Sequence, residues 1–320
     1  MLVVTERDYM KWPSWDLVFE WEDEMVNSIP NAKLFHAKDF CIADKPFFEI
    51  LGSEIGFNHN TLLLHGENSF HFEMTAVARR NRIWNQSNIS TCVIDFFATK
   101  NWLHTFYKMH NRVKQLYVSS KEVYDFLQTN NPEREVKHLP LTISDKYRIS
   151  KDTKYDKQYD LVLVGRQSPT MMDYLHTYEK AHPITYVYRG KIDGNNFPYY
   201  ANNGKFVGYG NTREEYFNLL RYSRTVMYST PGIDDGKQTN GFHQVTPRFL
   251  EAIASGCHVI SQFIDNPDTD FFELDKMSQR VKCYKDFEKA MDYALSTPVD
   301  MQKYSQYLEK HYTSIYKNLM

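Results

Sequence analysis

Gly241-Phe242-His243-Gln244-Val245-Thr246-Pro247-Arg248-Phe249-Leu250-Glu251-Ala252-Ile253-Ala254-Ser255-Gly256-Cys257 is the stretch that carries the sharpest local signal in this chain. Thr246 is a good N-cap, and Pro247 suits a first helical position because its missing N–H would be unpaired there. Gly256 is a typical helix end, and the apolar segment 258–260 follows directly. A helix placed immediately before a buried strand is typical of layered α/β proteins.

The start of this helix is also a candidate anion site. Unpaired N–H groups and the positive end of the helix dipole attract phosphate. Arg248 would add a charged fork, and Glu251, one turn beyond Pro247, would reach the hydroxyls of a ribose. The alternative is a capped helix whose arginine and glutamate only meet solvent, and the residues by themselves leave both readings open.

Outward from this stretch, short apolar strands alternate with amphipathic helices, which predicts parallel α/β layers. In the first half we expect strands at 61–64, 91–94, 115–119 and 138–141, with a helix from Ser120 to about Gln128. In the second half we expect strands at 159–164, 184–188, 205–209, 225–228 and 258–260. We expect helices at 171–180, 286–296 and 300–317, and a further helix that opens with Thr212 and Glu215. Between them, the polar segment 141–159 is the best linker. The pattern predicts two Rossmann-like domains with a cleft between them.

Composition excludes several classes of protein. The 320 residues contain 38 Lys plus Arg against 40 Asp plus Glu, a formal charge of -2, so nucleic acid is a disfavoured partner. No stretch approaches the roughly 20 apolar residues of a membrane span, and residues 1–8 do not resemble a secretory signal. The four cysteines have no metal-ligand spacing. We therefore expect a cytoplasmic protein and set aside channels, disulfide scaffolds and zinc modules.

The second half of the chain resembles a known family. Segment 246–256 is similar to the R-x-x-E-A-x-A-x-G signature of GT-B glycosyltransferases of the family 4 and spore-maturation type. The likeness continues upstream in the right order, with a first strand and glycine turn at 160–166, a base-contacting strand at 206–209 and a helix and strand at 213–229. The resemblance implies a GT-B fold with domains 1–150 and 151–299, and a final helix, 300–320, that crosses back to the N-terminal domain.

The same resemblance implies a donor site. Glu251 would hold the ribose, and Arg248 with the amides of Val245 and Thr246 would take the diphosphate. Two further contacts would come from the cleft end of a strand, where Arg166 would bind phosphate, and from Tyr209, which would line the base pocket. The donor would be a UDP- or GDP-sugar, with no cofactor and no metal.

Two positions depart from the family pattern. His243 stands where retaining members carry a glutamate, and no lysine follows Arg166 closely, so that Lys237 or Arg189 would have to replace it. His243 either assists the leaving diphosphate or the donor sugar, or is a loop histidine in water. Retention and inversion both stay open.

Other acidic and histidine residues are candidates from their position. Asp95 and His65 directly follow predicted strands of the N-terminal domain, where either would accept a proton from the acceptor hydroxyl or merely cap a helix. Asp268-Thr269-Asp270 has the form of the metal-binding D-x-D motif of the other glycosyltransferase fold, but its late place in the chain favours a turn. The loop acids Asp234 and Asp235 also favour a solvated turn over sugar binding.

Together these observations predict a glycosyltransferase, with hexosyl transfer expected, acting on a glycan or lipid-linked acceptor. The resemblance suggests bacterial surface polysaccharide synthesis, in the cytoplasm or peripherally at the inner face of the membrane. Two alternatives stay open: a nucleotide-sugar epimerase of the same architecture and a DNA-modifying sugar transferase. A solute-binding protein is disfavoured because we see no export signal.

Overall fold

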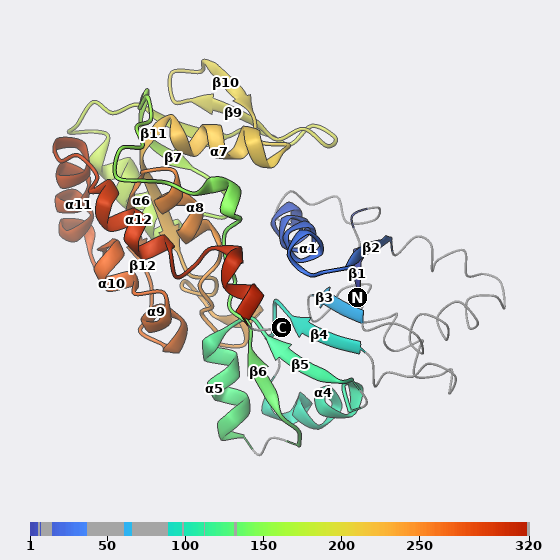
Figure 1. The fold of residues 1–320 in the computed structure, drawn as a ribbon. Helices are drawn as coiled ribbons and strands as arrows, with labels where there is room; N and C mark the ends of the chain where they lie inside the picture. Colours follow the sequence, from blue (N-terminus) through green and yellow to red (C-terminus); the bar gives the residue numbers. More distant parts are fainter. Residues whose placement is uncertain are drawn as a thin grey trace. The chain divides into compact units, whose positions relative to one another are not determined.

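The computed structural model describes residues 1–5, 7, 15–36, 61–65, 89–97, 99–111, 113–130 and 133–318. The chain divides into two compact units, Met1–Leu141 with Tyr316–Met320, and Thr142–Ile315 (Figure 1). We call them unit 1 and unit 2. The described strands form one sheet in each unit, with the order β2-β1-β3-β4-β5-β6 in unit 1 and β10-β9-β8-β7-β11-β12-β13 in unit 2.

All described strands of unit 1 are parallel. They are β1 (Leu2–Thr5), β2 (Lys33–His36), β3 (Thr61–His65), β4 (Ile89–Val93), β5 (Gln115–Val118) and β6 (Val136–His138). Three expected strands are confirmed, whereas the fourth, expected at 138–141, ends where we expected it to begin. Pro140 has no N–H to donate to a ladder, which explains why the strand stops before it.

The described helices of unit 1 are α1 (Asp16–Ser28), α4 (Leu103–Met109), α5 (Lys121–Thr129) and the short 3-10 segment η4 (Lys100–Trp102). The Ser120 hydroxyl accepts a hydrogen bond from the Val123 amide at 3.2 Å, which confirms the expected cap of α5. This cap satisfies an amide that has no partner inside the helix.

The unit 2 sheet is parallel except for its antiparallel β9 and β10. Its strands are β7 (Tyr159–Leu163), β8 (Tyr186–Arg189), β9 (Pro198–Ala201), β10 (Phe206–Tyr209), β11 (Ser223–Ser229), β12 (His258–Gln262) and β13 (Gln279–Arg280). We did not expect β9, because it starts on a proline, a residue that a strand tolerates only at its first position, at an edge or at a bulge.

Two groups of helices cover the two faces of this sheet (Figure 1). Helices α6 (Pro169–Tyr178) and α11 (Tyr284–Ser296) share one hydrophobic core with one face, and α7 (Arg213–Arg221), α8 (Arg248–Ala254) and α12 (Met301–Leu308) share another with the opposite face. The remaining segments are α9 (Pro267–Phe271), α10 (Leu274–Met277), η5 (Asp145–Tyr147), η6 (Lys237–Thr239) and η7 (Thr313–Asn318). α9 corrects our expectation of a turn at 268–270.

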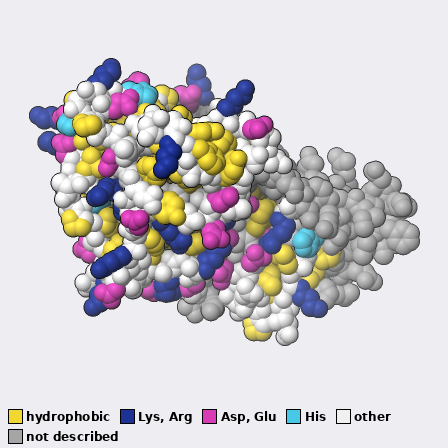
Figure 2. Space-filling view, turned by 90° about the horizontal axis from the view of Figure 1, so that it is seen from above, with side chains coloured by type: hydrophobic (Ala, Val, Ile, Leu, Met, Phe, Trp, Pro, Cys, Tyr) yellow, Lys and Arg dark blue, Asp and Glu magenta, His cyan; other side chains and the backbone are white. Residues whose placement is uncertain are grey.

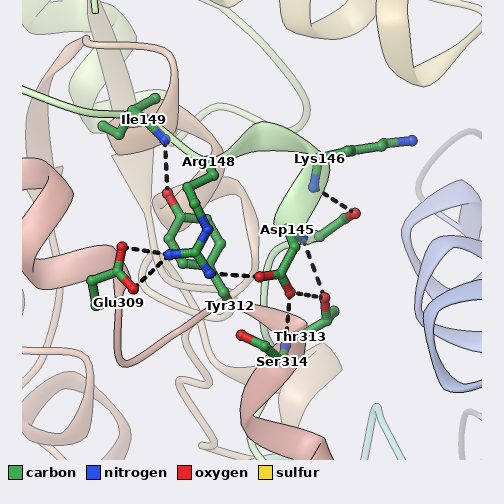
Figure 3. A network of polar contacts seen from close by, with 9 residues as sticks. Asp145, Lys146, Arg148, Ile149, Glu309, Tyr312, Thr313 and Ser314 are labelled. Atoms are coloured by element: carbon green, nitrogen blue, oxygen red, sulfur yellow. Dashed lines mark hydrogen bonds and ion pairs between the residues drawn. The ribbon is translucent and has the colours of Figure 1, made fainter. Parts of the chain in front are cut away.

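The segment after Leu141 is attached to the end of the chain (Figure 3). Ile143 pairs with Tyr312 in a β-bridge, and the Asp145 carboxylate accepts hydrogen bonds from the Thr313 hydroxyl and the Ser314 amide, each at 2.7 Å. Residues 142–150 therefore belong to unit 2, although we expected the first domain to extend to residue 150.

The last helical segment is divided between the units. α12 packs on α8 inside unit 2, and the chain groups with unit 1 only from Tyr316, whose hydroxyl donates to the Pro140 carbonyl at 2.5 Å. The return to the N-terminal part is therefore made by the residues after α12 and not by α12 itself.

The surface of the described residues carries charges of both signs. Figure 2 shows basic and acidic side chains interspersed over one face of the molecule, with hydrophobic side chains between them. This mixture agrees with the near balance of 38 basic and 40 acidic residues in the sequence. No helix among the described residues has both the length and the apolar character needed to cross a membrane.

Candidate functional site

The candidate site lies at the carboxyl edge of the unit 2 sheet, where open α/β sheets bind ligands. β7 ends at Leu163 and is followed by Val164, Gly165 and Arg166. Gly165 has a φ of +69°, in the left-handed region that favours glycine. The strand therefore turns sharply at the same place as the glycine turn expected from the sequence.

Gly165 also makes room for Arg248. A Cβ atom at Gly165 would lie 2.7 Å from the central carbon of the Arg248 guanidinium, which is closer than real contacts allow. Arg248 Nη1 donates to the Val164 and Arg166 carbonyls, each at 3.1 Å. These contacts hold the guanidinium directly on the turn after β7.

Two more arginines lie near this edge. Arg166 follows the turn and donates from Nη1 to the Gln238 side chain at 3.2 Å, and Arg189 is the last residue of β8. Burial raises the pKa of Tyr199, and the positive charges of Arg189 and Arg248 oppose that rise, which places both guanidinium groups within electrostatic range of one hydroxyl.

No ion pair in the described part of the chain joins Arg166, Arg189 or Arg248 to a carboxylate. Three guanidinium groups without a described carboxylate in ion-pair contact therefore lie at or next to this edge. Such an edge is suited to a phosphate or diphosphate group, because arginine presents several N–H donors in a planar fork.

The amides expected to bind phosphate are already occupied within the protein. The Val245 amide donates to Asp268 Oδ2 at 2.9 Å, and the Thr246 amide donates to the Tyr228 hydroxyl at 2.9 Å. α8 begins at Arg248, with Pro247 in the N-cap position and no side-chain cap, so the expectation that Thr246 caps the helix was wrong. The Thr246 hydroxyl lies 3.4 Å from the Tyr228 hydroxyl instead.

Glu251 lies in the interior. Its residue exposure is 4%, and its Oε1 forms an ion pair with Arg213 Nη2 at 2.6 Å. Burial and the nearby charge of Glu251 raise the pKa of Tyr216 well above its ordinary value. The burial of Glu251 contradicts the reading in which the glutamate of a capped helix only meets solvent.

Two other candidates of unit 2 lie at or near the surface. His243 is part-buried in the loop before α8, where its Nδ1 lies 3.0 Å from the Pro231 carbonyl and its own carbonyl accepts from Asn266. Tyr209, at the end of β10, is 42% exposed and packs edge-on against Phe206 with a centroid distance of 5.1 Å. An exposed aromatic ring of this kind is available for stacking with a planar base.

The loop acids have structural partners. Asp234 accepts from the Ser168 hydroxyl at 2.8 Å, and Asp235 accepts from the Lys237 amide at 3.1 Å, as in the turn we expected. Among the described residues, no three His, Cys, Asp or Glu side chains are grouped so that they would hold a metal ion. Transfer without a metal stays a prediction.

The candidates of unit 1 lie at the carboxyl edge of its sheet. His65 is the last residue of β3 and pairs in register with Val93 of β4, and Asp95 is an exposed residue two positions beyond Val93. The backbone positions of His65 and Asp95 are therefore on neighbouring strand ends. Their grouping with His243 in one active site stays a prediction.

Three residues that shape the site were not expected from the sequence: Arg213, Tyr228 and Asp268. We expected only a turn at Asp268, although this residue is buried and holds the Val245 amide. Arg213 did carry a signal, because a cation on the first turn of a helix is opposed by the helix dipole. Such a local exception often has a tertiary cause.

Three-dimensional comparison identifies the architecture. The structure is similar to that of Anabaena Alr3699/HepE in complex with UDP-glucose (TM-score 0.61, 10% identity, 99% of this chain and 96% of that chain). It is also similar to AviGT4, a glycosyltransferase involved in avilamycin A biosynthesis (0.57, 11%, 99% and 94%). The fold is GT-B.

Other similarities limit the functional conclusions that this fold supports. A putative UDP-N-acetylglucosamine 2-epimerase from Listeria monocytogenes is similar as well (TM-score 0.52, 12% identity, 99% of this chain and 93% of that chain). Two further similar proteins are longer, and this chain spans only 58% and 56% of their length. No family model matches the sequence, and no curated protein matches it. The fold is thus shared by a glycosyltransferase and by a putative epimerase.

Proposed function

We propose that this GT-B protein is a glycosyltransferase that binds the nucleoside diphosphate part of a sugar donor at the carboxyl edge of the unit 2 sheet. The observation that carries the proposal is the convergence of Arg166, Arg189 and Arg248 on that edge without carboxylate partners among the described residues. A leaving diphosphate gains negative charge as the glycosidic bond breaks, so fixed positive groups at that point lower the barrier.

The contacts of these side chains support a division of roles. Arg248, fixed on the turn at Gly165, would bind the diphosphate together with Arg166. Arg189 or Lys237 would take the place of the lysine that the family carries and this sequence lacks. Glu251 would hold the ribose and Tyr209 would meet the base. Because the Val245 and Thr246 amides are internally bonded, we assign the phosphates to guanidinium groups and not to these amides.

The finer features of the proposal rest on the family 4 resemblance. We propose a UDP- or GDP-linked hexose as the donor, a glycan or lipid-linked acceptor, and a role in bacterial surface polysaccharide synthesis in the cytoplasm or at the inner face of the membrane. The acceptor would bind unit 1, with His65, Asp95 and His243 as candidate catalytic residues. Neither a cofactor nor a metal is part of the proposal.

A second candidate is a nucleotide-sugar epimerase, favoured by the likeness to the Listeria protein. The deciding experiment incubates the purified chain with UDP- and GDP-sugars, with and without glycan acceptors. A transferase releases nucleoside diphosphate in proportion to added acceptor, whereas an epimerase interconverts nucleotide sugars with no acceptor. If neither product forms and no nucleotide binds by calorimetry, the proposal is wrong.

Replacing Arg248 with Ala is expected to weaken nucleoside diphosphate binding by about 1.5–3 kcal/mol, the usual value of hydrogen bonds to a charged group. The change removes two hydrogen bonds to carbonyls of the turn as well as the charge. Isothermal calorimetry with UDP and GDP measures the loss. Arg224→Ala, an exposed arginine on β11, serves as the control and should bind normally.

Replacing Gly165 with Ala is expected to weaken the same binding about tenfold, or about 1.4 kcal/mol, by displacing Arg248. Gly204→Ala is the matched control, because Gly204 has a φ of +85° but no atom within 4 Å of the added Cβ. Both variants carry left-handed strain, and only Gly165→Ala disturbs the guanidinium. Equal nucleotide affinity in the two variants would contradict the role given to Arg248.

A further inference from the structure

Arg213 is an unusual residue for its position. It is the first residue of α7, directly after the Thr212 N-cap, whose hydroxyl and the Glu215 side chain form a capping box. A positive charge there is repelled by the amide end of the helix dipole, which favours acids in a first turn. The cost of placing an arginine at this point indicates an interaction elsewhere that compensates for it.

The compensating interactions are with rings and with one carboxylate. The Arg213 side chain is 13% exposed and its guanidinium carbon lies 5.9, 5.5 and 5.1 Å from the ring centres of Tyr147, Tyr216 and Phe217. Among the described residues, the acid that pairs with it is Glu251, at 2.6 Å. The stacked rings of Tyr147 and Phe217, 3.7 Å apart, make this cage rigid.

Helix α7 therefore fixes the carboxylate of α8 through its first residue. Arg213 pairs with Glu251 Oε1 at 2.6 Å, and Tyr216, one turn further along α7, is close enough for the charge of Glu251 to raise its pKa. A carboxylate has about four acceptor sites, so the pairing with Arg213 leaves capacity for other donors. A ribose presents two adjacent hydroxyls, which suits one oriented carboxylate.

We propose that Arg213 is a positioning residue that orients Glu251 toward the nucleotide ribose, so that the site selects ribose over a sugar without its 2′ and 3′ hydroxyls. This inference rests on the proposed function and deepens it. Without the guanidinium, the carboxylate would lose its charged partner and with it its fixed direction. The two hydroxyls would then gain little from it, and ligands with and without them would bind alike.

The test compares two ligands in each variant: UDP or GDP, whichever binds the wild-type chain, and its 2′,3′-dideoxy analogue. Hydrogen bonds to a charged group predict at least a tenfold preference for the ribonucleotide in the wild type. We expect Arg213→Met to reduce the preference below threefold and Arg213→Lys, which keeps the charge, to restore part of it. A loss of folded protein scales both dissociation constants equally, so the ratio reports positioning and not stability.

Arg221→Met is the matched control, because Arg221 lies on the same helix, with its guanidinium 5.6 and 5.4 Å from the rings of Tyr155 and Phe217, and has no ion pair with Glu251. Its ratio should equal that of the wild type. A full preference retained in both Arg213 variants overturns the inference and leaves nucleotide binding standing. Wild-type binding with no preference overturns it in the same way, and wild-type protein that binds neither ligand overturns the proposed function as well.

Discussion

Replacing Arg213 with Met is expected to lower the free energy of unfolding by about 3–5 kcal/mol, the usual cost of breaking a buried ion pair by removing one partner. The effect should come from Glu251, whose 4% exposure leaves its charge without water when the guanidinium is lost. Urea unfolding followed by far-ultraviolet circular dichroism measures the change. The double variant Arg213→Met with Glu251→Gln should recover about half of the loss or more, because its buried carboxamide carries no charge.

The chain offers an internal control for this measurement. All five tryptophans fall within unit 1, at Trp12, Trp15, Trp21, Trp84 and Trp102. Tryptophan fluorescence therefore reports that unit alone. If the units unfold separately, Arg213→Met should shift the dichroism transition of unit 2 and leave the fluorescence transition in place. A double variant no more stable than Arg213→Met would contradict the uncompensated charge as the cause.

Unit 2 is expected to lose about 3 kcal/mol of stability between pH 6.5 and pH 4 through His311. This residue is 3% exposed, and its Nε2 has no hydrogen-bond partner among the described residues. Burial lowers the pKa of His311 from 6.5 to about 4. Above pH 6.5 His311 is neutral in both the folded and the unfolded state, so its contribution to the free energy of unfolding is constant. As the pH falls from 6.5 to 4, only the unfolded state takes up the proton, and the free energy of unfolding decreases by about 1.4 kcal/mol per pH unit. Below pH 4 both states are protonated and the loss ends.

His311→Phe should flatten this dependence, because the ring stacks on Phe272 at 5.3 Å and an apolar ring fits the same place. Denaturant unfolding at pH 4, 5, 6 and 7 measures the free energy of unfolding of the variant and of the wild type. The contributions of the carboxylates cancel in the difference because both proteins contain the same carboxylates. His104→Phe, an exposed position at 75% side-chain exposure, is the control. A variant with the full wild-type acid loss would show that His311 is not the group responsible.

An equivalent effect is expected in unit 1. Burial lowers the pKa of His138 to about 4, and the imidazole Nε2 lies 3.2 Å from the Ser119 carbonyl. Tryptophan fluorescence should therefore show an acid-dependent transition that responds to His138→Phe and not to His311→Phe.

Helices with local start signals were predictable from the sequence. Ser120 before α5 and the pair Thr212 and Glu215 at α7 cap as expected, because a cap depends on residues three apart in the chain. The glycine turn at Gly165 was also predictable, since only a glycine follows β7 there without strain. Of the antiparallel pair at the sheet edge, β10 was predicted and β9 was not, because β9 is short and begins with a proline.

The surroundings of Glu251 could not be predicted from the residues near it in the sequence. Its place on the first turn of α8 left two readings open, a carboxylate that reaches a ribose and one that only meets solvent. The solvent reading assumes that no other element covers this side of the helix. In the structure α7 packs on α8 and Arg213 pairs with the carboxylate, a contact that the apolar pattern of the chain does not predict.

The layered α/β fold, the position of most strands along the chain and Arg166 after the glycine turn could be predicted from the sequence, because alternating apolar patterns and glycine turns act over a few residues. The donors that stay available for a ligand could not. Val245 and Thr246 have amides that look free in the chain, and Asp268 and Tyr228 reach them from separate elements. Hydrogen-bond partners of this kind depend on how helices and strands pack, which no spacing along the chain records.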